Sequence, residues 1–136
     1  MKYYKKSDGT IWAFELDGSQ DFLITADMVA ITVEQADAIR NPPPTTKQLI
    51  AANVSAIQAE LDRQAQAKGY DNIVSACSYA AQAVGAPFQA EGAAFLAWRS
   101  SVWVQAYSEL AQIQAGTMSM PTPAQAVAAM PVLVLP

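Results

Sequence analysis

The sequence predicts an α+β chain with a small N-terminal antiparallel β meander, a proline-rich joint and a mainly α-helical C-terminal region with one long, aromatic-rich helix. Three observations predict this fold class. Short apolar runs separated by Asp-Gly turns fill the first thirty residues, a pattern typical of strands. Three consecutive prolines follow. After them, apolar residues recur at intervals of three and four, which is the period of a helix.

The proline run predicts how the 136 residues are divided. We expect a small β-rich domain at 1–40 and a helical domain at 47–136. Between them, consecutive prolines at 41–46 predict a stiff, extended linker. Bulky apolar residues are few, since alanine makes up much of the 52% hydrophobic content, so each part has a small core.

In the first domain, the runs "KYYKK" and "TIWAFEL" flank Asp8-Gly9, which predicts a tight hairpin because glycine accepts positive φ. Trp12, Phe14 and Leu16 alternate with other residues in the second run, so we expect them to form the buried face. The later run "FLITADMVAIT" predicts one or two further short strands. So small a sheet needs something to pack on.

Two helix starts carry local signals. Thr32 and Gln35 have the spacing of a capping box, which predicts a helix over Val33 to Arg40. Thr122 followed by Pro123 predicts a short helix near the end of the sequence, because proline is favoured at the first helical position. The run "PVLVLP" after it is expected to be extended.

The helix expected after the prolines ends at Gly69 and carries a heptad-like stripe, with Asn53 on an opposite, polar face. The stripe consists of Ile50, Val54, Ile57 and Leu61. Two interpretations stay open. The stripe packs within its own chain, as short stripes more often do, or it joins copies into a homo-oligomer through a short coiled coil. In the next helix we expect Asp71 as N-cap and Ile73, Val74 and Cys77 turned inward.

The stretch "PFQAEGAAFLAWRSSVW" opens the longest expected helix, from about Phe88 to Ala115. Apolar side chains form two stripes along it: Phe95, Trp98 and Val102 on one, Leu96, Trp103, Tyr107 and Leu110 on the other. Aromatic residues at helical spacing are usually core, yet tryptophan and arginine together are typical interface anchors. The candidate partner-binding residues are Phe88, Phe95, Trp98, Arg99, Trp103 and Tyr107.

Groups suited to catalysis are scarce. Histidine is absent, which removes the usual general base and the commonest metal ligand. Cys77 has no histidine to activate it, and Ser100 and Ser101 have no base. We therefore expect no enzyme, cofactor or metal site. A net charge of −4 argues against a nucleic-acid partner, and no run of apolar residues predicts a membrane span or a signal peptide.

The chain as a whole resembles the tail-fibre assembly proteins of tailed bacteriophages and prophages. The most specific stretches are "YDNIVSACSYA", "PFQAEGAAFLAWRSSVW" and the ending "PTPAQAVAAMPVLVLP", and the N-terminal half is a looser match. The resemblance implies a small chaperone that helps fibre subunits to fold and trimerise, with the tail-fibre protein as partner. It defines no binding residues by a chemical motif.

The resemblance places such a chaperone in the host cytoplasm, or on the virion tail if it stays with the finished fibre. The alternative is a permanent structural component of the tail or tail fibre, in which the helical stripe would oligomerise. A third and weaker hypothesis is an enzyme acting on cell-envelope material. A chaperone without ATP chemistry needs only an apolar patch of some size and enough charge to stay soluble.

Overall fold

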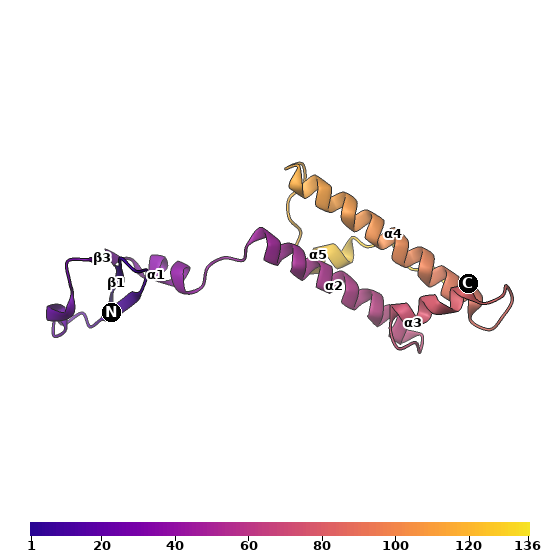
Figure 1. The fold of residues 1–136 in the computed structure, drawn as a ribbon, viewed down its shortest axis with the longest axis horizontal. Helices are drawn as coiled ribbons and strands as arrows, with labels where there is room; N and C mark the ends of the chain where they lie inside the picture. Colours follow the sequence, from indigo (N-terminus) through magenta and orange to yellow (C-terminus); the bar gives the residue numbers. More distant parts are fainter. The chain divides into compact units, whose positions relative to one another are not determined.

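The computed structural model describes residues 1–136 and divides them into two compact units, Met1–Pro44 and Thr45–Pro136 (Figure 1). The division falls at the end of the proline run. The first unit holds a small sheet and one helix, and the second is helical, as the α+β expectation requires.

A three-stranded antiparallel sheet forms the first unit, with β1 at Lys2–Lys6, β2 at Ile11–Phe14 and β3 at Met28–Ile31. The predicted hairpin between β1 and β2 is confirmed. Gly9 has a φ of +90°, a conformation that favours glycine, and the carboxylate of Asp8 accepts a hydrogen bond from the Thr10 amide at 2.9 Å. Local turn chemistry therefore sets this corner of the sheet.

The strand order is β2-β1-β3, whereas a meander would place β2 in the centre. The connection from β2 to β3, which includes the 3₁₀ turn η1 at Asp21–Leu23, runs past β1 to its other edge. Ion pairs between β1 and this connection accompany that path: Lys2 pairs with Asp21, and Lys6 lies 3.8 Å from Asp27. These contacts lie far apart in sequence, so strand periodicity could not reveal the order.

The expected buried face of β2 is only partly correct. Phe14 is buried and lies edge-on to the ring of Tyr4, with 5.8 Å between ring centroids. Trp12 stacks on Phe14 but stays 43% exposed, and Leu16 is 73% exposed. Because β2 ends at Phe14, Leu16 no longer follows the strand alternation. Trp12 lies on an edge strand of a sheet too small to cover it.

Helix α1 spans Val33–Arg40, as predicted, and its capping box is formed. The Thr32 hydroxyl accepts a hydrogen bond from the Gln35 amide at 3.1 Å, and the Gln35 side chain accepts one from the Thr32 amide at 2.9 Å. The Arg40 guanidinium lies 5.0 Å from the centre of the Tyr3 ring, which fixes the end of α1 against β1.

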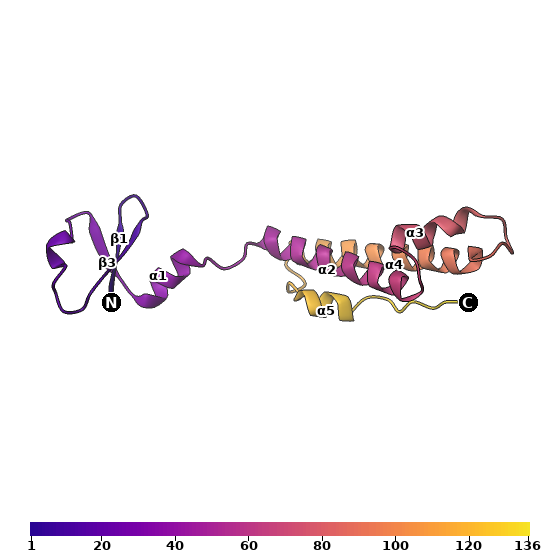
Figure 2. The ribbon, with the colours of Figure 1, turned by 90° about the horizontal axis from the view of Figure 1, so that it is seen from below.

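The second unit contains two long helices, α2 at Thr46–Ala67 and α4 at Gln89–Gln114. The short α3 at Ile73–Ser78 and the 3₁₀ turn η2 at Tyr79–Ala81 join them at one end. Helix α5, at Pro123–Ala128, packs on α2, and Figure 2 shows α5 and the extended segment after it on one side of the two long helices.

The core of this unit lies between α2, α3, α4 and α5. Its buried members are Ile57, Leu61, Ala65, Ile73, Ala76, Phe95, Trp98, Val102 and Ala126. Met130, Leu133 and Leu135 pack against it from the extended segment, while Val132 and Val134 point out with exposures of 84% and 77%. "PVLVLP" is thus an extended strip that covers the core, with alternate side chains inward.

Helix α4 approaches α3 and η2 closely at Gly92. A Cβ atom at this position would lie 2.8 Å from the backbone nitrogen of Ala80 and 2.9 Å from the carbonyl oxygen of Ala76. Both contacts are shorter than van der Waals separation and both involve backbone, which cannot rotate away. Glycine is required here for space, since α4 keeps helical φ at this residue.

Several helix details differ from the sequence expectations. Asn72, rather than Asp71, is the N-cap of α3, because its side chain accepts a hydrogen bond from the Ser75 amide at 2.9 Å. Val74 was expected inward but is 59% exposed, as it lies on the outer side of this short helix. The predicted long helix and the predicted start of α5 at Thr122 and Pro123 are confirmed.

Candidate functional site

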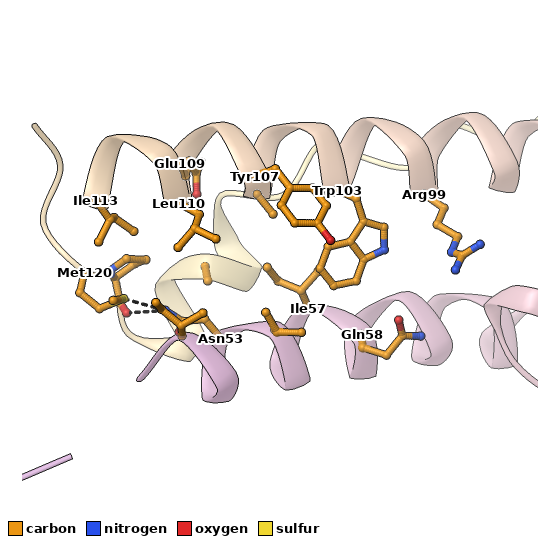
Figure 3. Close-up of a pocket in the computed structure, with 15 residues that line it drawn as sticks. Asn53, Ile57, Gln58, Arg99, Trp103, Tyr107, Glu109, Leu110, Ile113 and Met120 are labelled. Carbon is orange, nitrogen blue, oxygen red and sulfur yellow. Dashed lines mark hydrogen bonds between the residues drawn. The ribbon is translucent and has the colours of Figure 1, made fainter. Parts of the chain in front are cut away.

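A groove of about 450 Å³ lies in the helical unit between the N-terminal half of α2 and the C-terminal half of α4 (Figure 3). Apolar walls come from Ile50, Val54 and Ile57 of α2 and from Trp103, Ala106, Tyr107, Leu110 and Ile113 of α4. Met120, Pro121 and Ala126 form its floor. Its volume is in the range of small ligand pockets, but its long helical walls suit a peptide segment better than a compact molecule.

Helix α5 contributes to this groove. It packs on α2, and its Ala126 lines the groove between α2 and α4. Near the α3 end, by contrast, Phe95 and Leu61 are fully buried. The fold therefore closes its core at one end and leaves an apolar cleft at the other.

Two aromatic side chains dominate the α4 wall. Trp103 is half-buried and packs partly on the core, and Tyr107 is 69% exposed. Their rings lie 6.3 Å apart between centroids and are tilted by 41°. Large, partly exposed aromatic residues at the rim of an apolar groove are common anchors for protein partners.

Four polar side chains line the groove, and two of them have hydrogen-bond partners. The Gln58 amide donates a hydrogen bond to the Asp62 carboxylate at 3.2 Å, and the Glu109 carboxylate accepts one from Gln105 at 2.8 Å. Asn53 and Arg99 are the other two, and each has a buried polar atom without a partner.

Asn53 is 8% exposed and lies at the end of the groove next to its floor (Figure 3). Its Nδ2 donates to the Pro121 carbonyl oxygen at 3.0 Å and lies 3.5 Å from the Met120 sulfur. The Oδ1 atom accepts no hydrogen bond. Asn53 was expected on a polar outer face, and this expectation is wrong, because the buried side of α2 follows residues 53, 57, 61 and 65.

Arg99 projects from α4 toward α2 at the opposite end of the groove (Figure 3). Its Nε is buried without a hydrogen-bond partner. The ion pairs of the chain involve Lys2, Lys6 and Arg63, so no carboxylate neutralises Arg99. The groove therefore has an unpaired cation at one end and an unpaired acceptor at the other.

The structure separates the six predicted partner-binding residues into three groups. Arg99, Trp103 and Tyr107 come together in the groove. Phe88 is 60% exposed at the start of α4, beside the Tyr79 ring and outside the groove. Phe95 and Trp98, with exposures of 0% and 6%, are core residues that no partner can reach, so their assignment as partner contacts is wrong. They lie on the α4 face that packs against α3 and the extended segment.

The predicted self-association stripe is also divided. Ile57 and Leu61 are buried in the core of their own chain, so they cannot carry a coiled coil between copies. Ile50 and Val54 line the groove together with Ile57, and Val54 is 46% exposed. The stripe thus follows its intrachain interpretation at Ile57 and Leu61.

Cys77 lies at the closed end of the unit and is partly buried against the core. Burial raises the pKa of its thiol, and the Arg99 cation acts in the opposite direction with less effect. A raised pKa favours the protonated thiol, which is the weakly nucleophilic form. Tyr70, whose ring lies 5.6 Å from that of Phe95 between centroids, has its pKa raised by burial first and by the charge of Glu91 second.

No three histidine, cysteine, aspartate or glutamate side chains gather in the structure in a way that could hold a metal ion. None of the helices combines the length and apolar character needed to cross a bilayer. Comparison with known proteins finds no match among protein-family models, curated proteins or solved structures. The groove is consequently the feature of the molecule from which a function can be argued.

Sequence reasoning named six groove residues, three as partner contacts (Arg99, Trp103 and Tyr107) and three as self-association contacts (Ile50, Val54 and Ile57). Leu110 and Ile113 follow Trp103 and Tyr107 at helical spacing, so the second stripe of α4 was a usable signal. Met120 and Pro121 had no such signal, because they reach the groove through a turn that only the folded chain defines.

Proposed function

We propose that this chain is a tail-fibre assembly chaperone, an interaction protein that holds an apolar segment of a fibre subunit in the groove between α2 and α4. The single observation that supports this function is the groove itself, with Tyr107 exposed and Trp103 partly exposed along an apolar wall about three turns long. The sequence resemblance to tail-fibre assembly proteins supplies the identity of the partner.

The physical task of such a chaperone is modest. Fibre subunits that have not yet trimerised expose apolar surface and unpaired strand edges, which favour aggregation. Covering one such segment lowers the concentration of the aggregating species and requires no bond chemistry. A partner that is released on trimerisation must bind only moderately.

Co-expression tests the proposal. The full chain is produced together with a trimeric tail-fibre subunit encoded in the same genome, and the soluble fraction of the fibre is measured. We expect the chain to raise that fraction several-fold, and Val54→Glu to abolish the gain, because it puts a charge on the apolar wall of the groove.

Val74→Glu is the matched control. Val74 is also an exposed helical valine, at 59%, but lies outside the groove, so this variant should solubilise the fibre as well as the natural chain does. Equal fibre solubility with and without the chain would contradict the proposal. Recovery of the chain at fibre stoichiometry in purified particles would instead favour a structural component.

A further inference from the structure

We propose that the occupant of the groove is an amphipathic α-helix that carries a carboxylate side chain at the Arg99 end and a hydrogen-bond donor at the Asn53 end. This inference rests on the proposed function, since it specifies the kind of partner segment that the groove receives. It is supported by two buried polar atoms without hydrogen-bond partners, Arg99 Nε and Asn53 Oδ1, and by the helical walls of the groove.

The walls favour a helix over a strand. Both α2 and α4 use their backbone amides and carbonyls within their own helices, so an extended segment in the groove would find no backbone partners. A helix satisfies its backbone internally and presents only side chains, as in other helix-in-groove complexes. The α4 wall from Arg99 to Ile113 covers 14 residue steps, or about 21 Å, which matches an occupant of about four turns.

Charge complementarity selects the polar group at the Arg99 end. Arg99 has no carboxylate partner in the chain, and its buried Nε lacks an acceptor. A guanidinium binds carboxylates through paired N–H groups, and such bonds are stronger between charged partners than between neutral ones. An aspartate or glutamate of the occupant would neutralise this charge.

The Asn53 end of the groove favours a hydrogen-bond donor on the occupant. Asn53 is fixed by its hydrogen bond to Pro121, so its Oδ1 is held in place as an acceptor. A serine, threonine, asparagine, glutamine or lysine side chain could donate to it. Between the two ends, Trp103, Tyr107 and Leu110 offer contacts to apolar side chains at positions i, i+4 and i+7 of the occupant.

A peptide-display selection tests this without any fibre protein. The probe is a library of alanine-rich helical peptides of about 16 residues, with one face randomised. It is selected in parallel against the full natural chain and against Arg99→Gln. On the natural chain we expect apolar residues at i, i+4 and i+7 and an acidic residue at one fixed flanking position; on Arg99→Gln the acidic preference should disappear.

A thermodynamic cycle with one selected peptide measures the pairing. Replacing its acidic residue by glutamine or asparagine should weaken binding to the natural chain about tenfold, and to Arg99→Gln less than about twofold. Arg63→Gln is the control, since Arg63 pairs with Glu60 outside the groove and should leave the discrimination intact. Arg99→Lys guards against misfolding, because it keeps the charge and should retain part of the discrimination.

Four results would overturn the inference: no binder in the library, binders without an acid at a fixed position, equal discrimination by Arg99→Gln, or a dimer of the natural chain that Val54→Glu dissociates. The last would place a second copy in the groove. Fibre solubilisation is measured separately, so a chaperone that prefers another segment would fail this test and still pass the co-expression test.

Discussion

The indole nitrogen of Trp98 donates a hydrogen bond to the carbonyl oxygen of Pro131, at a distance of 2.7 Å. This bond ties the middle of α4 to the first residue of the extended segment, across 33 positions of sequence. Trp98 is therefore an anchor for its own chain. Trp103, five residues further along α4, has no such bond and faces the groove.

The two tryptophans should differ in their effect on stability. Trp98→Phe leaves the Pro131 carbonyl without its donor and should lower the free energy of unfolding by about 1–3 kcal/mol. Trp103→Phe should cost less than about 1 kcal/mol, because its ring is partly exposed and its nitrogen has no partner to lose. Urea unfolding followed by far-ultraviolet circular dichroism measures both. Equal losses would show that the bond to Pro131 is unimportant.

Gly92→Ala should destabilise the helical unit by about 1–3 kcal/mol, since the new methyl group would collide with the backbone of Ala76 and Ala80. The sign is diagnostic, because in an open helix the same change stabilises by about 0.5–1 kcal/mol. Ala97→Gly, at an exposed position of α4, measures the helix-propensity effect alone. A more stable Gly92→Ala chain would mean that α4 does not approach α3 so closely.

The helix cap of α3 gives a second paired test. Asn72→Ala removes the acceptor for the Ser75 amide and should cost about 1 kcal/mol of unfolding free energy. Asp71→Ala should change stability by less than about 0.5 kcal/mol, because the Asp71 side chain makes no cap. Thermal unfolding of both variants decides between the two neighbours. A larger loss from Asp71→Ala would restore the cap expected from the sequence.

The pH dependence of Cys77 alkylation should show the raised pKa of its thiol. Because burial raises the pKa of the thiol, the midpoint of the pH–rate profile with iodoacetamide should lie higher for the folded chain than for the chain in urea. Arg99→Gln removes the cation that opposes this effect, so the midpoint should move higher still. Restricted access alone would slow the reaction at every pH and leave the midpoint unchanged, which would contradict the prediction.

Elements with local causes could be predicted from the sequence. The Asp8-Gly9 turn, the capping box at Thr32 and Gln35, and the start of α5 at Pro123 each depend on residues within four positions of one another. Helix periodicity also located the row of Phe95, Trp98 and Val102. It did not reveal that the row is buried, since Phe95 and Trp98 were expected to contact a partner.

Features that depend on distant contacts could not be predicted. The position of β1 in the centre of the sheet goes with contacts between residues far apart in sequence, among them the Lys2–Asp21 and Lys6–Asp27 pairs. In the sequence, Asn53 has the character of a surface residue, and only the folded chain shows its hydrogen bond to Pro121. The groove is formed by α2, α4 and the turn before α5. The stripe on α4 was visible in the sequence, whereas the contribution of the turn before α5 is defined only in the folded chain.

The extended segment also sets an order of events during synthesis. Leu133 and Leu135 complete the cover of a core whose other members lie between residues 57 and 130. A ribosome must therefore translate residue 135, and the exit tunnel must release it, before Trp98 and its neighbours are shielded from water. Until that moment the nascent chain exposes apolar side chains of its own core to water.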